Sequence, residues 1–204
     1  MERDRHGARQ PHRFDVRRAG VLDERERFDT LPPAEVFALL DAPPAATVVD
    51  FGTGTGTYAL ELARSRPDLR VIALDEQPPM LDRLRAKLAE HPLQNVEPLL
   101  AETVESRALK GKVDRVLGLN VLHELGDEAL DQLGALLRAD GLAVFIDWNA
   151  LVERAVGPPR EHVYSPSEAT TRLEARGFAV LRQQLFPLHY AVVCRWEGRA
   201  EGAP

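Results

Sequence analysis

The chain has 204 residues, of which 44% are apolar, and carries a formal net charge of −6 with a pI near 5.6. This length suits one domain with its own hydrophobic core. Because the chain is acidic and its arginines are scattered rather than clustered, a nucleic acid is an unlikely partner on composition alone.

Cysteine content and hydropathy exclude further classes of protein. Cys194 is the only cysteine, which excludes an internal disulfide and a multi-thiolate metal site, and we expect no metal. No apolar run approaches the roughly 20 residues that span a bilayer, and no secretory signal opens the sequence. We therefore expect a cytoplasmic protein with no membrane partner. The sequence leaves the oligomeric state open.

Both ends of the chain are expected to lie outside the main domain. Residues 1–33 are predicted to form an N-terminal arm, because the first 13 are charged and nearly free of apolar groups that would offset the entropy of ordering them. Residues 14–27 stay charged but include the apolar anchors Phe14 and Leu22, which favours a short helix or a lid. Residues 199–204 are predicted to be a tail.

Between these ends, apolar strands alternate regularly with amphipathic helices. Strands are predicted at 47–50, 71–74, 96–100, 113–119 and 142–146, and helices at 34–41, 57–65, 79–91 and 128–137. Asp140-Gly141 is expected to separate the last of these helices from the strand that follows it. Short, continuously apolar strands of this kind predict a parallel sheet covered on both faces.

The C-terminal part has a different pattern. Ser165-Pro166-Ser167-Glu168 predicts a helix start with a capping box, and Gly177 is expected to end that helix after Arg176. Two β-rich segments, 179–185 and 188–196, are close enough to pair as a hairpin. The expected fold is therefore α/β, a doubly wound and mostly parallel seven-stranded sheet with an antiparallel C-terminal hairpin, over residues 34–198.

A glycine-rich loop follows the first predicted strand. Gly52, Gly54 and Gly56 stand at alternate positions, which lets the backbone turn sharply and lets a ligand approach main-chain N–H groups. Asp50 ends the strand, and its carboxylate would repel a pyrophosphate but can accept hydrogen bonds from an ammonium group. S-adenosylmethionine has such a group and no phosphate. The dinucleotide fingerprint fails because Thr57 occupies the place of its third small residue, and no Walker A sequence is present.

A second acidic position lies about 20 residues beyond the loop. Asp75 ends the second predicted strand, where a carboxylate can accept bonds from both hydroxyls of a ribose. Glu76 adjoins it and is a further candidate. The alternative is a solvated strand terminus, which the sequence leaves open.

With these residues in place, the sequence resembles the class I S-adenosylmethionine-dependent methyltransferases, and within them the small-molecule branch with a simple core domain. The resemblance covers residues 46–196 and rests first on Val49-Asp50-Phe51-Gly52-Thr53-Gly54-Thr55-Gly56. Leu74-Asp75, Met80-Leu81 and the segments 114–125 and 136–148 support it. It implies a Rossmann-like methyltransferase fold, S-adenosylmethionine as cofactor and a small-molecule methyl acceptor as partner.

The resemblance also implies roles for individual residues around the methionine and ribose parts of the cofactor. Gly52, Thr53 and Gly54 would line both parts, with Gly56 completing the loop. Asp50 would lie near the amino group. Asp75 would hold the ribose hydroxyls.

The remaining implied contacts concern the adenine and the end of the fourth strand. Met80 would lie against the adenine. Glu102 and Thr103 fall where members of the family often have Asp and Ala after the third strand, so Glu102 would accept from the adenine amino group. Leu119 and Asn120 would lie beside the methionine part.

Methyl transfer demands few catalytic groups, because the sulfonium carbon is already activated. His123 follows the fourth predicted strand and is the candidate base, although a loop histidine that only packs is an equal alternative. Asp147 ends the fifth strand and would orient the acceptor, or merely end the strand. The polar segment 157–164 is a candidate to close over the acceptor. A lid that meets the cofactor carboxylate would draw on Arg13, Phe14, Arg25 and Arg27.

The leading hypothesis is thus an enzyme that methylates a small molecule by in-line displacement. One rival is a catalytically silent S-adenosylmethionine-binding module with a regulatory or interaction role, because methyl transfer has no obligatory catalytic signature. The other is an NAD-dependent oxidoreductase, against which the glycine spacing and Asp50 both count.

Overall fold

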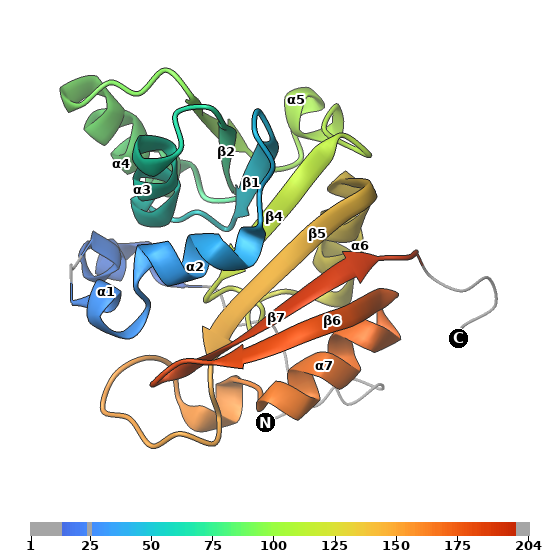
Figure 1. Ribbon diagram of the computed structural model, residues 1–204. Coiled ribbons are helices and arrows are strands. Elements are labelled where there is room, and N and C mark those ends of the chain that lie inside the picture. Colours follow the sequence, from blue (N-terminus) through green and yellow to red (C-terminus); the bar gives the residue numbers. More distant parts are fainter. Residues whose placement is uncertain (1–13, 24–25, 199–204) are drawn as a thin grey trace.

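The computed structural model describes residues 14–23 and 26–198 (Figure 1). Three segments lie outside the described residues: 1–13 of the predicted arm, which includes Arg13; 24–25, which includes Arg25; and the predicted tail 199–204. None of the described helices is long and apolar enough to cross a membrane.

A single seven-stranded sheet runs through the described part of the chain, in the order β3-β2-β1-β4-β5-β7-β6. The strands are β1 (Thr47–Phe51), β2 (Arg70–Asp75), β3 (Val96–Leu100), β4 (Val113–Leu119), β5 (Leu137–Trp148), β6 (Phe178–Leu185) and β7 (His189–Trp196). The first five are parallel, and β7 runs antiparallel to both β5 and β6. The predicted fold is confirmed, including its antiparallel C-terminal hairpin.

Helices cover both faces of this sheet (Figure 1). The α-helices are α1 (Arg27–Thr30), α2 (Pro33–Leu40), α3 (Thr57–Ser65), α4 (Pro78–Glu90), α5 (Val104–Arg107), α6 (Asp127–Leu136) and α7 (Pro166–Ala175). Two 3-10 helices, η1 (Val16–Asp23) and η2 (Arg160–His162), complete the set. Buried side chains of α2, α3 and α4 form the core on one face, and those of α6 and α7 form the core on the other. The inner strands β1, β2 and β4 are therefore buried on both sides, as their continuous apolar runs predict.

The capping box at the start of α7 forms as predicted. The backbone N–H of Glu168 donates to Ser165 Oγ, and the backbone N–H of Ser165 donates to a carboxylate oxygen of Glu168 at 2.7 Å. Gly177 has a φ of +84°, which only a glycine adopts without strain. The helix ends at Ala175, one residue before the predicted end.

One predicted boundary is wrong by five residues. The strand expected to start at Leu142 starts at Leu137, directly after α6, so Asp140-Gly141 lies inside β5 and does not separate the two elements. Leu137 pairs with Val113 at once, and the register of β4 with β5 shifts before the regular pairing begins. A Cβ at Gly141 would lie 2.9 Å from the Val113 carbonyl oxygen, so this irregular pairing depends on the glycine.

Candidate functional site

A cavity of about 860 Å³ opens at the carboxyl ends of β1, β2, β3 and β4. This volume lies in the range of roughly 300 to 1,000 Å³ that is usual for small-molecule sites. Its walls come from the glycine loop, the ends of β2 and β3, the segment from Leu119 to Gln132, and three side chains of the N-terminal segment, Phe14, Leu22 and Arg27. Open α/β sheets place their ligands at this edge.

The three alternate glycines of the loop are required by its backbone. Gly52, Gly54 and Gly56 have φ angles of +71°, +56° and +78°, in the left-handed region that other residues rarely adopt. A Cβ at Gly52 would lie 2.8 Å from a methyl group of Val121, and one at Gly56 would lie 2.4 Å from a methyl group of Leu84. Gly52 and Gly54 line the cavity, whereas Gly56 faces the packing against α4.

Asp50 is a buried carboxylate at the floor of the cavity. It is 4% exposed, and the hydroxyl of Thr53 donates to it at 2.7 Å. Burial, together with the charge of Asp75, raises the pKa of Asp50 to about 6, against the opposing effects of the Thr53 hydrogen bond and the charge of Arg27. Because these contacts do not fully offset its burial, the Asp50 carboxylate favours a cationic ligand group.

Asp75 joins the glycine loop to the start of α4. One of its oxygens accepts the backbone N–H of Gly54 and the other accepts that of Gln77, each at 2.8 Å. Burial raises the pKa of Asp75, and these two backbone N–H groups oppose the shift. Because a carboxylate has about four lone-pair positions, it can still accept from a ligand in the cavity that it lines.

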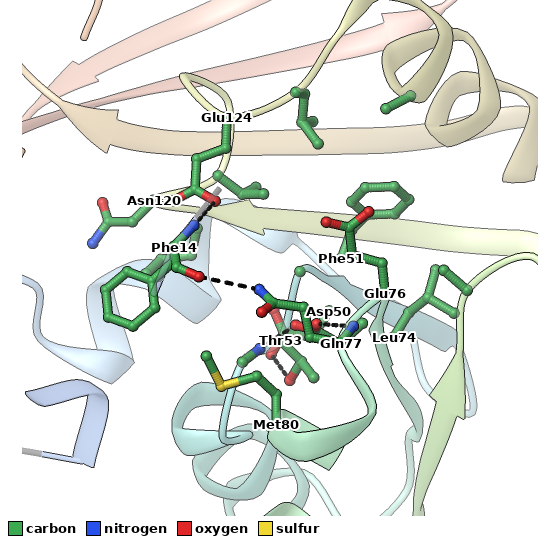
Figure 2. Close-up of a pocket in the computed structure, with 18 of the residues that line it drawn as sticks. Phe14, Asp50, Phe51, Thr53, Leu74, Glu76, Gln77, Met80, Asn120 and Glu124 are labelled. Carbon is green, nitrogen blue, oxygen red and sulfur yellow. Dashed lines mark hydrogen bonds between the residues drawn. The ribbon is translucent and has the colours of Figure 1, made fainter. Parts of the chain in front are cut away.

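Most of the other predicted cofactor residues also line the cavity. Met80 is buried at 1% exposure on α4, below the loop in Figure 2, and Glu102 has a φ of +63° just after β3. Glu76, Leu119 and Asn120 belong to the same walls. Thr103 does not line the cavity, since its hydroxyl accepts the backbone N–H of Ser106 in the first turn of α5.

The two predicted catalytic residues are brought together behind the cavity wall. His123 Nδ1 lies 2.8 Å from Asp147 Oδ1, and the backbone N–H of His123 donates to Asp147 Oδ2 at 2.9 Å. Neither residue lines the cavity; His123 is 6% exposed and Asp147 is fully buried. The neighbouring Glu124 lines it instead. Sequence reasoning missed Glu124, although an acidic residue just past β4 is a signal of the same kind as Asp50 and Asp75.

The N-terminal segment lies against the cavity. The backbone N–H of Phe14 donates to Glu124 Oε2 at 3.1 Å, and the hydroxyl of Thr57 donates to the carbonyl of Leu22 at 2.9 Å. Asp23 accepts from the ammonium of Lys87 at 2.5 Å, which ties the end of η1 to α4. Phe14 and Arg27, two of the four residues suggested for a lid, thus line the cavity together with Leu22.

The segment expected to close over the acceptor packs elsewhere. Arg154 donates to the carbonyl of Pro158 at 2.7 Å, and its guanidinium lies 5.3 Å from the ring centroid of Trp148. A Cβ on Gly157 would lie 3.0 Å from that same ring. No residue of 157–164, all of which the structure describes, is part of the cavity wall.

Comparison with known proteins identifies the family. Residues 48–141 match the family model described as "Methyltransferase domain". A SAM-dependent methyltransferase from Aquifex aeolicus superposes with a TM-score of 0.82 and 29% identity, over 89% of this chain and 98% of that one. Residues 48–141 form a methyltransferase domain of the class I, S-adenosylmethionine-dependent type. S-adenosylmethionine is the methyl donor of this family.

Curated relatives of this methyltransferase are similar over part of their length. "Ribosomal RNA small subunit methyltransferase G" of Deinococcus radiodurans is 41% identical over 101 residues, which are 47% of this chain and 38% of the relative. "Release factor glutamine methyltransferase" of Mycolicibacterium smegmatis is 36% identical over 142 residues, 61% of this chain and 49% of the relative. The chain thus spans less than half the length of either relative.

Proposed function

We propose that the protein transfers the methyl group of S-adenosylmethionine to a small, uncharged or cationic acceptor that binds in the cavity beside Glu124. Bound S-adenosylmethionine supplies an electrophilic methyl carbon on a positively charged sulfur. The residues of this chain hold that cofactor, admit the acceptor and keep water and polyanions out.

The cavity has groups that fit each part of this cofactor. Asp50 offers its buried carboxylate to the ammonium group, and Arg27 offers a guanidinium to the cofactor carboxylate. Gly52, Thr53 and Gly54 present an approachable backbone to the methionine part, together with Leu119 and Asn120. A phosphate-bearing dinucleotide fits poorly, because its negative charge would face Asp50.

The other end of the cavity matches a nucleoside. Asp75, Glu76 and Met80 line this end; the two carboxylates would accept from ribose hydroxyls, and Met80 would offer a soft apolar surface to adenine. Glu102 remains the candidate acceptor for the adenine amino group, and its exposure at the cavity rim leaves it free to rotate toward a ligand.

The charge of the cavity wall is the observation that carries the choice of acceptor. Among the described residues that line it, a single side chain, Arg27, is basic, and the acidic ones are Asp50, Asp75, Glu76, Glu102, Glu124 and Glu128. Such a wall repels a phosphate backbone and favours a neutral or positively charged molecule. The matched relatives named for ribosomal RNA share only a part of their length with this chain, so their substrate is not carried over.

Two measurements test this function. Calorimetric titration should show binding of S-adenosylmethionine and S-adenosylhomocysteine but not of NAD, and NAD binding alone would contradict the proposal. Label from methyl-labelled S-adenosylmethionine should then enter a small-molecule extract and not ribosomal RNA or protein. Label in RNA or protein would show that the acceptor class is wrong. Cofactor binding without label in any fraction would favour a silent binding module.

A further inference from the structure

A chain of three side chains connects the end of β5 to the cavity. Asp147 is fully buried and accepts from His123 and from the backbone N–H of Trp148, the latter at 2.7 Å. Because an ionised carboxylate only accepts, His123 carries a proton on Nδ1 toward Asp147 and turns Nε2 the other way. That nitrogen lies 3.6 Å from Glu124 Oε1.

Glu124 is the member of this chain that reaches the cavity. Its side chain is 19% exposed, against 5% for His123 and 0% for Asp147. In Figure 2, Phe14 lies between Glu124 and Met80: its backbone N–H donates to Glu124, and its carbonyl accepts from the Gln77 side chain at 3.5 Å. Glu124 and the glycine loop line the same cavity, so a ligand on the loop shares that cavity with Glu124.

Burial makes this carboxyl a proton acceptor suited to neutral pH. It raises the pKa of Glu124 to about 7, while the nearby His123 lowers it and the charges of Asp147 and Asp75 raise it. The pKa of His123 is raised above its ordinary value. Burial lowers this pKa, but the charge and hydrogen bond of Asp147 and the charge of Glu124 outweigh the effect of burial. Arg154 acts in the opposite direction on His123. A general base works best when its pKa lies near the working pH.

We propose that Glu124 is the catalytic base that takes the proton from an N–H or O–H acceptor, and that His123, held by Asp147, is the positioning residue for its carboxylate. This inference rests on the proposed function. The lone pair of the acceptor atom forms the bond to the methyl carbon, the carbon–sulfur bond breaks with its electron pair passing to sulfur, and the acceptor proton goes to Glu124. The sulfonium becomes a neutral thioether, so charge and electrons balance.

A purely structural role for Glu124 is the competing explanation, because its Oε2 accepts the backbone N–H of Phe14. Glu124→Gln separates the two roles. The amide oxygen can still accept that N–H and the side-chain volume hardly changes, whereas the amide cannot take a proton at neutral pH. Glu90→Gln, at the exposed end of α4, is the matched control for loss of one acidic charge.

The first test needs no acceptor. Calorimetry in two buffers of different ionisation enthalpy gives the protons released when S-adenosylmethionine or S-adenosylhomocysteine binds at each pH. A sulfonium facing Glu124 favours its ionised form, so S-adenosylmethionine should release more protons than S-adenosylhomocysteine near pH 7. Glu124→Gln should remove this excess and Glu90→Gln should keep it. His123→Gln removes a cation that lowers the pKa of Glu124, so it should move the release to higher pH. An excess that persists in Glu124→Gln would overturn the placement of Glu124 at the sulfonium.

The second test separates proton removal from alignment. Transfer from iodomethane to S-adenosylhomocysteine releases iodide and requires no base. Glu124→Gln should slow this reaction only through loss of the negative charge that favours the sulfonium, by about tenfold or less, but should lower label transfer from S-adenosylmethionine to the extract by about 10²- to 10⁴-fold. If Glu124→Gln lowered the rates of both reactions equally, or did not lower label transfer to the extract, Glu124 would not be the base. If neither cofactor bound the wild-type protein, the proposed function would fail instead, and the titrations would show this directly.

Discussion

Gly56→Ala is the substitution whose cost can be worked out most fully from the structure. Gly56 is the N-cap of α3, with φ +78° and ψ +17°. An alanine held in this left-handed conformation costs about 1–2 kcal/mol. Its Cβ would also lie 2.4, 2.9 and 3.1 Å from three carbon atoms of the Leu84 side chain, whereas carbon atoms in contact are normally about 3.5–4.0 Å apart.

Leu84 has no room to move away, since it is fully buried between α4 and the sheet. Overpacking of this kind costs about 1–3 kcal/mol, so Gly56→Ala should lower the free energy of unfolding by about 2–5 kcal/mol in total. Gly111→Ala is the matched control, because Gly111 has a φ of +69° but nothing within 4 Å of its Cβ position. It should cost only the conformational part, about 1–2 kcal/mol.

Urea unfolding of the two variants measures the difference, provided that the slope of the transition is unchanged. A further comparison isolates the contact: in a Leu84→Ala background, Gly56→Ala should cost no more than Gly111→Ala does in the wild type. If Gly56→Ala and Gly111→Ala were equally destabilising in the wild-type background, the packing of the loop against α4 would not be what requires this glycine.

Three other predictions concern individual side chains. Asp75→Ala should weaken S-adenosylhomocysteine binding at least roughly tenfold by calorimetry, and unchanged affinity in a folded variant would refute the ribose assignment. The pKa of Asp50 is about 6 in the folded protein against 3.8 as the ordinary value, so its ionisation destabilises the fold as pH rises through that window. Asp50→Asn should therefore raise the free energy of unfolding of the free protein at pH 7 by at most about 3 kcal/mol, and should give no gain below pH 4. The same substitution should weaken S-adenosylmethionine binding. A lower free energy of unfolding at pH 7 would contradict this reasoning. Burial raises the pKa of the Cys194 thiol, so this thiol should react with an aromatic disulfide reagent only after the protein unfolds. Rapid reaction of the native protein would instead show that the pairing of β5 with β7 opens.

The sequence predicts well those features that depend on neighbouring residues. Continuous apolar runs locate the parallel strands, and the residues 165–168 specify the capping box that forms. The alternate glycines and the two acids that end β1 and β2 locate the cavity for the same reason, because the carboxyl ends of parallel strands meet at one edge.

Features that depend on irregular backbone were missed. His123 and Glu124 are adjacent in the sequence, and no periodicity tells which one faces a ligand. Asn120 has a φ of +56°, and the N–H groups of Glu124 and Leu125 both donate to the carbonyl of Val121, which makes a single helix-like turn that is too short to show a hydrophobic period. That turn buries the histidine against Asp147 and directs Glu124 into the cavity.

Under the proposed function, Asp50 and Glu124, two of the carboxyls with raised pKa values, are linked through the cofactor. Asp50 and Glu124 are both costly to ionise because burial removes water from them. A cofactor that carries an ammonium beside Asp50 and a sulfonium facing Glu124 lowers both pKa values, and each unit of that shift is worth about 1.4 kcal/mol of binding. Cofactor binding therefore ionises the base that the acceptor needs. An acceptor that arrives before the cofactor meets a carboxyl that is partly protonated at neutral pH, so productive binding follows the order cofactor first, acceptor second.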